Sequence, residues 1–321
     1  MTLLLDVQSL SVEFPQRRQN LQALDNISFS LTKGEVLGFV GESGAGKSLT
    51  GAAIMGLLEP PGHISNGQIY FEGQSIEQNA AHVRGNKIGM IFQDPLTSLN
   101  PLRTVGDQLV ETIRFHLGLG YEDAVSRAKE LLEEVGISPE RASAFPHEFS
   151  GGMRQRIVIA LALAPEPKLI IADEPTTALD VSIQAQILKL LRRLCRDRGA
   201  SVILITHDMG VIAETTDRVA VLYAGRIVEI GSTAEIIKNP RHPYTKGLMA
   251  ATPNLDQVSF ETILPQIPGN MPSLDNLPSG CRFHPRCQEA MPSCRSVTPI
   301  FNDGVACHLF DNDQSKGDKH G

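Results

Sequence analysis

Short apolar runs separated by polar turns open the chain and predict strands at residues 3–7, 11–14, 27–31 and 36–40. Two further runs, at 67–72 and 87–93, have the same character. The runs at 168–173 and 201–206 are continuously apolar, which is typical of strands that are buried on both faces of a sheet.

Apolar residues at helical spacing predict helices between these strands. One helix is expected at 47–58, and one is expected to end at Gly136 after Val125, Ala128, Leu132 and Val135. Ser182 is expected to cap another helix, which ends near Gly199. Strands that alternate with helices predict an α/β core, and the pattern from about 94 to 164 predicts a helical subdomain inserted into it.

Beyond residue 235 the chain becomes rich in Pro and loop residues. We therefore divide it into a core domain at 1–235 and an extension at 236–321. The extension contains four cysteines at 281–307 and a polar tail at 311–321.

Residues 41–48 read GESGAGKS and fit the phosphate-binding pattern of Gly, four residues, then Gly-Lys-Ser. A predicted strand precedes them and a predicted helix follows, which is the context that this motif needs. Backbone N–H groups and the helix N-terminus would surround the phosphates, Lys47 would reach the β- and γ-phosphates, and Ser48 would ligate Mg²⁺. The residues expected to contact ATP here are Gly41, Ser43, Gly44, Gly46, Lys47, Ser48 and Leu49.

Composition excludes several other classes of protein. The net charge of −7, the aromatic content of 5% and the absence of Trp argue against nucleic acid as a partner. The first residues lack the pattern of a signal peptide, and no apolar run reaches the length of a membrane span.

The apolar run at 169–172 is followed by two acids, Asp173 and Glu174. Two adjacent carboxylates opposite a phosphate loop can have different roles in ATP hydrolysis. Asp173 would orient the water shell of Mg²⁺, and Glu174 would polarise the attacking water.

Ser150, Gly151 and Gly152 begin a predicted helix and leave N–H groups open to an anion. The stretch Phe149-Ser-Gly-Gly-Met153 resembles the signature of ATP-binding-cassette (ABC) ATPases, usually Leu-Ser-Gly-Gly-Gln, with departures at its first and last positions. The resemblance implies the P-loop ABC fold, with an N-terminal antiparallel β subdomain. It also implies that the signature of one subunit closes over ATP held by the phosphate loop of another.

The remaining landmarks of the family occur in order along the chain. Gln93 resembles the loop glutamine that contacts Mg²⁺, and His207 resembles the switch histidine near the γ-phosphate. Ala178-Leu179-Asp180 resembles the loop that contacts the partner subunit, and Phe14 lies where the family places an aromatic side chain against adenine. The resemblance thus implies Glu174, His207 and Gln93 as catalytic residues.

Residues 93–101 (QDPLTSLNP) and 242–245 (HPYT) resemble the ATPases of dipeptide and oligopeptide importers. Nickel importers and some antimicrobial-peptide systems belong to the same subfamily. The resemblance implies a peripheral subunit at the cytoplasmic face of the inner membrane. Its partners would be a second ATPase in a heterodimer, two permease subunits and an external binding protein. Two alternatives are a soluble ABC ATPase that acts on nucleic acid or ribosomes and a redox-responsive binding module.

Cys281, Cys287, Cys294 and Cys307 cluster in a chain without a secretion signal, which suggests a metal rather than disulfides. They lack the close Cys-x₂₋₄-Cys pair of structural zinc sites. Their wide spacing suits a [4Fe–4S] cluster, which some peptide-importer ATPases carry in a similar segment. Zinc and reduced structural thiols remain alternatives, whereas Cys195 is expected to be a buried core thiol.

Overall fold

The computed structural model describes residues 2–17, 19–177, 179–252 and 265–311, within a chain that forms two compact units. Unit 1 comprises residues 1–5, 31–36 and 71–205, and unit 2 comprises residues 6–30, 37–70 and 206–321. Most of the predicted polar tail lies outside the described residues.

Unit 1 contains three parallel strands, β6 (Ile88–Ile91), β7 (Leu169–Asp173) and β8 (Ser201–Ile205). β7 lies between the other two, and Asp173 pairs with Ile205 at the carboxyl end of both strands. Every residue of β7 and β8 is buried, which confirms the prediction from their continuous apolar runs.

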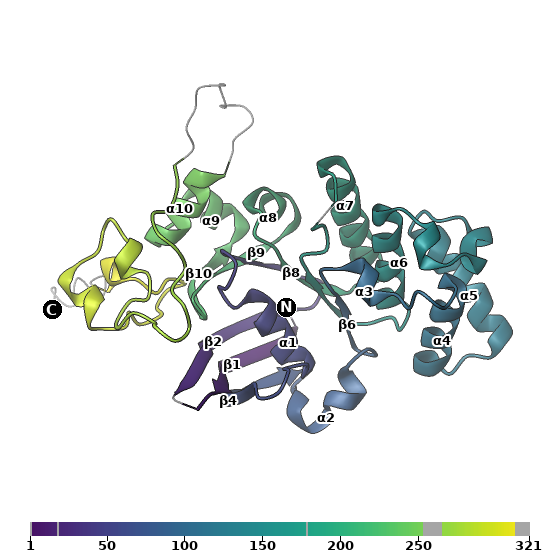
Figure 1. Cartoon of the computed structure of the whole chain (residues 1–321), viewed down its shortest axis with the longest axis horizontal. Helices are drawn as coiled ribbons and strands as arrows, with labels where there is room; N and C mark the ends of the chain where they lie inside the picture. The colour runs from purple at the N-terminus through teal and green to yellow at the C-terminus, as the bar shows by residue number, and fades with distance from the viewer. Residues whose placement is uncertain (1, 18, 178, 253–264, 312–321) are drawn as a thin grey trace, which may run out of the picture. The chain divides into compact units, whose positions relative to one another are not determined.

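The helices of unit 1 include the predicted insertion (Figure 1). Between β6 and β7 lie α3 (Pro95–Ser98), α4 (Val105–Leu117), α5 (Tyr121–Glu134) and α6 (Gly151–Leu163). α2 (Ile76–Val83) precedes β6, and α7 (Val181–Asp197) precedes β8. Gly136, with φ 75°, follows the last turn of α5 as predicted. The expected cap of α7 is wrong by two residues, because Asp180 and not Ser182 is its N-cap.

Unit 2 contains most of the N-terminal strands, β1 (Leu3–Pro15), β2 (Asn20–Thr32) and β4 (His63–Phe71), with β1 between the other two. The sequence predicts two short strands where β1 is continuous. The break in the apolar pattern coincides with Ser9, whose φ of 50° kinks the strand. β3 (Val36–Val40) leads into the phosphate loop and α1 (Lys47–Met55), which ends three residues before the predicted end.

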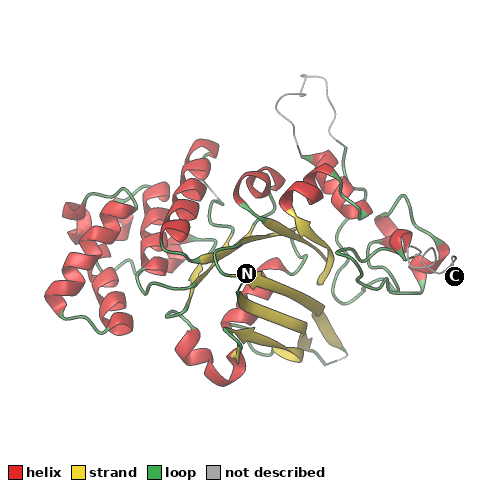
Figure 2. Cartoon of the chain, turned by 180° about the vertical axis from the view of Figure 1, so that it is seen from behind, coloured by secondary structure: helices red, strands yellow, loops and turns green. Residues whose placement is uncertain are grey.

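Further along unit 2, β9 (Arg218–Tyr223) pairs in parallel with β3, and β10 (Arg226–Ser232) pairs antiparallel with β9. Three helices, α8 (Met209–Thr215), α9 (Thr233–Lys238) and α10 (Pro243–Ala251), complete the regular structure. Beyond α10 the described chain consists of loops and short 3-10 turns, including His284–Arg286 and Pro292–Arg295 (Figure 2).

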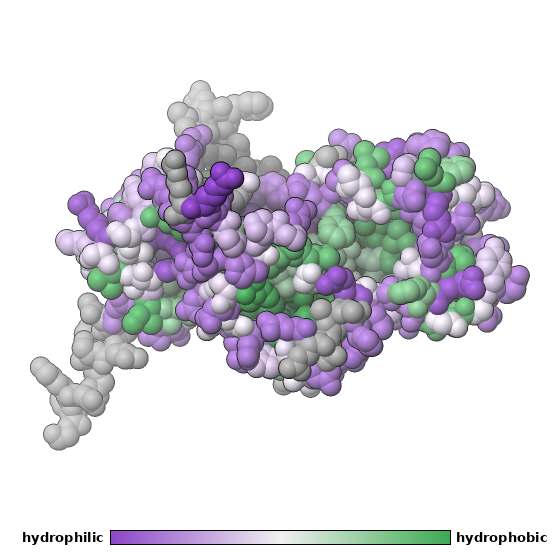
Figure 3. Space-filling view, turned by 60° about the horizontal axis from the view of Figure 1, so that its bottom comes forward, coloured by the Kyte–Doolittle hydropathy of each residue, from purple (hydrophilic) through white to green (hydrophobic). Residues whose placement is uncertain are grey.

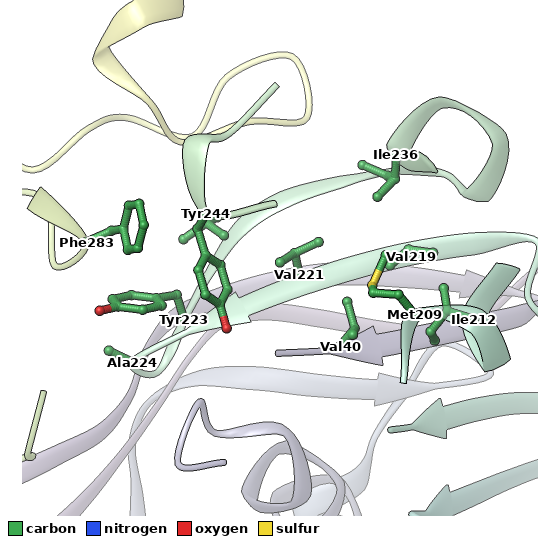
Figure 4. Packing of buried hydrophobic residues seen from close by; sticks show 11 residues of the cluster. Val40, Met209, Ile212, Val219, Val221, Tyr223, Ala224, Ile236, Tyr244 and Phe283 are labelled. Carbon is green, nitrogen blue, oxygen red and sulfur yellow. The ribbon is translucent and has the colours of Figure 1, made fainter. Parts of the chain in front are cut away.

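The C-terminal segment contributes to the core of unit 2. Phe283 is buried with Tyr223 of β9 and Tyr244 of α10, and their rings face one another at one end of a cluster that includes Val40 (Figure 4). Ring centroids are 4.7 Å apart for Tyr223 and Tyr244 and 5.1 Å apart for Tyr223 and Phe283. The extension therefore packs around aromatic side chains on β9 and α10.

None of the helices among the described residues is both long enough and apolar enough to cross a bilayer. Hydrophobic residues nevertheless reach the surface in several patches on the face shown in Figure 3. Among the large hydrophobic side chains of unit 1, the most exposed are Leu102 and Phe115, on the helical insertion, and Val181, at the start of α7.

Candidate nucleotide site

The phosphate loop of unit 2 has the backbone that its glycines make possible. Gly41, Gly44 and Gly46 have φ angles of 153°, 82° and 103°, which side-chain-bearing residues rarely adopt. A Cβ atom at Gly41 would lie 2.3 Å from the carbonyl oxygen of Leu222, and one at Gly46 would lie 2.7 Å from Leu24. The loop therefore fits against β9 and β2 only with glycine at these two positions.

Lys47 is buried at the start of α1 and bends back over the loop. Its Nζ donates hydrogen bonds to the carbonyl oxygens of Gly41 and Glu42, at 2.8 and 3.0 Å. Ser43, Gly44 and Ser48 are exposed, whereas Leu49 is half-buried. The loop therefore fits a triphosphate with its magnesium ion, because it offers glycine N–H groups, an ammonium and an exposed hydroxyl.

Two other predicted ATP contacts lie in unit 2. Phe14 is half-buried in β1, and its ring covers Gly62, where an added Cβ would lie 2.5 Å from Phe14 Cε1. His207 is exposed and immediately precedes Asp208, the N-cap of α8. The roles of both residues stay predictions.

Unit 1 brings two predicted catalytic residues together. Gln93, just after β6, donates from Nε2 to Oε2 of Glu174, just after β7, at 3.1 Å. The Thr177 hydroxyl donates to the same carboxylate oxygen at 2.9 Å. Asp173, the last residue of β7, directly precedes Glu174 and is buried. Sequence reasoning missed Thr177, although its position three residues after Glu174 in a turn could have indicated it.

The backbone at Glu174 is strained, with a φ of 45° in a residue that carries a side chain. Its N–H donates to the carbonyl oxygen of Ile205 at 2.9 Å, which holds the residue in this conformation. Strain of this kind costs about 1–3 kcal/mol and tends to persist where it positions a functional group.

The signature stretch also lies in unit 1. Ser150 is the N-cap of α6 and accepts the N–H of Met153 at 3.4 Å, as predicted. A Cβ at Gly152 would lie 2.8 Å from Ile183 Cγ2 of α7. Asp180 is exposed at the start of α7, and Ala178 of the same motif lies outside the described residues.

Arg141 accounts for both departures from the usual signature. Its guanidinium lies 4.1 Å from the centre of the buried Phe149 ring, and its Nη1 contacts the sulfur of Met153 at 3.7 Å. It also donates from Nη2 to the carbonyl oxygen of Glu148 at 2.9 Å. One arginine thus stabilises the turn before Ser150 through a cation–π contact and a thioether contact.

The predicted metal centre is not confirmed. All five cysteines are free thiols, and the described residues include no group of three or more His, Cys, Asp or Glu side chains that could hold a metal ion. Zinc, which needs such a group, is therefore unsupported. Burial raises the pKa of Cys281, Cys287 and Cys307, the last to about 11, so that these thiols are protonated near neutral pH. Cys195 is buried as predicted, with its pKa raised to about 12.

Comparison with known proteins identifies two matching families. Residues 24–177 match the ABC transporter family, and residues 228–294 match the C-terminal region of oligopeptide/dipeptide transporters. The oligopeptide transport ATP-binding protein OppD of Bacillus subtilis is 54% identical over 90% of this chain and 83% of its own length. The dipeptide transport ATP-binding protein DppD of the same organism is 48% identical over 97% of this chain and 96% of its own.

Two solved structures support the same fold at 28% sequence identity. CbiO1 of Clostridium perfringens, part of the ABC transporter complex cbiONQ, aligns with a TM-score of 0.65 over 74% of this chain and 92% of its own. The dimeric cassette MJ0796 bound to ADP and phosphate aligns with a TM-score of 0.64 over 72% of this chain and 99% of its own.

Proposed function

Because this chain belongs to the ABC transporter family of ATP-binding proteins, we propose that it hydrolyses ATP to drive the import of oligopeptides or dipeptides. Two relatives that match over 90% and 97% of this chain are named for oligopeptide and dipeptide transport. The match to the C-terminal region of such transporters favours peptide over nickel as the cargo.

The site residues suggest how the chain performs this chemistry. Lys47 and the N–H groups of the phosphate loop bind the phosphates and stabilise the negative charge that develops on the γ-phosphate. Glu174, oriented by Gln93 and Thr177, accepts a hydrogen bond from the attacking water and places it in line with the γ-phosphate.

Magnesium would be held by Ser48, with Asp173 orienting its water ligands and Gln93 in contact with it. The ion supplies positive charge that neutralises the phosphate oxygens. His207 would contact the γ-phosphate, and Phe14 would stack on adenine. These roles follow from the family motifs on which the residues lie.

Two subunits would close around two ATP molecules. The Ser150–Gly152 turn of one would cover the triphosphate held by the phosphate loop of the other, and Asp180 would contact the partner. The exposed N-terminal end of α6 supports this arrangement, since it offers N–H groups to a phosphate. We propose a second ATPase, in a heterodimer, as the partner.

The permease subunits would dock beside Gln93 at the cytoplasmic face of the membrane, and an external binding protein would deliver the peptide. Phe92 and Leu96, which flank Gln93 in the sequence, are 45% and 58% exposed, and Leu102 further along the insertion is 86% exposed. These apolar side chains are ones that a permease helix would cover. Movement of Gln93 would then shift the Glu174 carboxylate through their hydrogen bond.

The observation that carries the catalytic assignment is the Glu174 carboxylate held by two neutral donors. Glu174→Gln replaces the carboxylate with an amide that cannot take the water proton, so ATP turnover should fall by about 10²-fold or more while ATP binding is retained. Phosphate release and ATP-dependent dimerisation, followed by size-exclusion chromatography, measure the two effects.

Glu122→Gln, on the exposed first turn of α5, is the matched control and should turn over ATP at the parental rate. If the Glu174→Gln protein turns over ATP as fast as this control, Glu174 is not the catalytic carboxylate.

We also propose that the four cysteines of the extension bind a [4Fe–4S] cluster. Each of the four thiols interacts electrostatically with the other three, so they lie in one region of the extension. A cluster is larger than a single ion, and its ligands stand further apart than those of zinc. Its metal charge would offset the burial that raises the pKa of Cys281, Cys287 and Cys307.

Anaerobically purified protein is therefore expected to contain iron and acid-labile sulfide in equal amounts, about four of each per chain. Cys281→Ser should remove both. Protein that contains zinc without iron would refute the cluster in favour of zinc, and protein that contains neither metal would leave the thiols reduced, with a structural role.

A further inference from the structure

The C-terminal extension holds the phosphate loop in place through Glu42. This residue is the first of the four variable positions of the loop, and its side chain pairs with Arg286 of the extension. Nη1 and Nη2 of Arg286 donate to the two carboxylate oxygens of Glu42 at 2.9 and 3.0 Å. The pair is bidentate, the geometry in which a guanidinium binds a carboxylate most strongly.

Arg286 is itself fixed on its other sides. Its Nε donates to the carbonyl oxygen of Pro268 at 2.7 Å, and its side chain is only 7% exposed. Burial alone would lower its pKa, but the hydrogen bonds to Glu42 and Tyr223 outweigh this effect and raise the pKa above its usual value. The guanidinium is therefore charged and held with its fork directed at Glu42.

The backbone of Glu42 is held by a second part of the extension. Its N–H donates to the hydroxyl of Tyr244 in α10 at 2.8 Å. Tyr244 is completely buried against Tyr223 and Phe283 (Figure 4). The side chain and backbone of one loop residue are thus anchored by residues that lie 244 and 202 positions later in the chain.

These contacts bear directly on Lys47, because its ammonium donates to the carbonyl oxygen of Glu42 at 3.0 Å. A shift of Glu42 would displace an acceptor that orients the phosphate-binding lysine. The charge matters as well, since an unpaired carboxylate on the loop would repel a triphosphate, and the repulsion is strong in a partly buried site.

We propose that Arg286, with Tyr244, is a positioning residue for ATP binding. It neutralises Glu42 and fixes the loop backbone that places Lys47. The proposal rests on the proposed function only in taking ATP as the ligand of the loop, and it does not depend on what the cysteines bind.

Arg286→Met in the full-length chain tests it. The substitution keeps the apolar stem and removes the charge, so Kd for a non-hydrolysable ATP analogue should rise about tenfold or more. Amide hydrogens of residues 41–48 should exchange faster, and KM for ATP should rise more than kcat falls. Arg286→Lys, which can make only one of the two bonds, should show a smaller rise in Kd.

The double variant Arg286→Met with Glu42→Gln separates charge from packing. Without the lone carboxylate, affinity for the analogue should recover most of the loss. Arg241→Met is the matched control, because Arg241 pairs with Asp303 at 2.9 Å and so ties down the same extension elsewhere. It should leave Kd and the exchange of residues 41–48 at parental values.

The proposal is overturned if Arg286→Met matches Arg241→Met in Kd and in exchange, or if the double variant binds no better than Arg286→Met. A loss of thermal stability alone, with unchanged Kd, would also reduce Arg286 to a structural anchor. Tyr244→Phe gives an independent test, since it should speed exchange at residue 42 without changing charge. Analogue binding and exchange need no turnover, so a parental protein that binds but does not hydrolyse ATP would refute the proposed function and leave this test intact.

Discussion

Single side chains in this protein are held by partners that the sequence does not indicate. Arg141 on Phe149 and Arg286 on Glu42 are two examples. The motifs themselves could be predicted, because each is a short local pattern with its own backbone requirement. Their partners could not, since Arg141 and Arg286 lie in stretches whose composition resembles any polar loop.

His242 offers a pH-dependent test at the same scale. It is 1% exposed, and its Nδ1 accepts the N–H of Tyr244 at 3.0 Å as the N-cap of α10. Burial, together with the charge of Lys246, lowers its pKa from 6.5 to about 3. Between these values the unfolded chain binds more protons than the folded one, so this group contributes stability above pH 6.5 that is lost as pH falls towards 3.

His242→Asn should retain the cap and remove the titration. We expect the free energy of unfolding of the variant to fall less steeply between pH 6.5 and 4.5, by up to about 1.4 kcal/mol per pH unit. Denaturant titrations at pH 6.5, 5.5 and 4.5 measure the slope. Parallel profiles for variant and parent would show that His242 does not titrate in the unfolding equilibrium.

Elements with strong local patterns were predicted well, and those that depend on distant contacts were not. The buried strands β7 and β8 and the helical insertion follow from their apolar spacing. β9 and β10 were missed because the first position of their turn, with a φ of 45°, is Ala224 and not the Asn, Asp or Gly that usually precedes the glycine there. α10 was missed because the stretch around it is rich in Pro, which argues against a helix. Pro243 is nevertheless compatible with α10, because it occupies the first helical position, where no N–H is needed.

The packing of α6 on α7 gives a prediction at this scale. Gly152→Ala would place a methyl group 2.8 Å from the branched side chain of Ile183, so the start of α6 must move away. A shift of about 1 Å in a catalytic element can cost about 10²-fold in rate. ATP turnover should therefore fall while the fold is retained, as measured by phosphate release and circular dichroism.

Gly120→Ala is the matched control, because Gly120 also begins a helix and its nearest neighbour would be Asp123 at 3.6 Å. It should behave as the parent. Equal activity of the two variants would show that the contact between Gly152 and Ile183 does not position the signature.

At the scale of the whole chain, the family could be predicted because its motifs occur in order, and the comparisons confirm the family. Composition alone argued only against some classes of protein, such as those that bind nucleic acid. The role of the extension could not be predicted, because a run of loops between cysteines carries no periodicity, and only folding shows that residues 282–286 reach the phosphate-loop side of unit 2.

Asp25 of β2 shows what this arrangement means for protein engineering. Its carboxylate is shared by Arg226 of β10 and Arg282 of the extension, with Oδ2 2.6 Å from a guanidinium nitrogen of each. Truncation of the chain before Arg282 would therefore remove one of the two arginines that pair with Asp25. It would also remove Arg286, the arginine that pairs with Glu42. A related ATPase that receives this extension should therefore have acids at the positions of Asp25 and Glu42, because Arg282 and Arg286 would otherwise find no counterion.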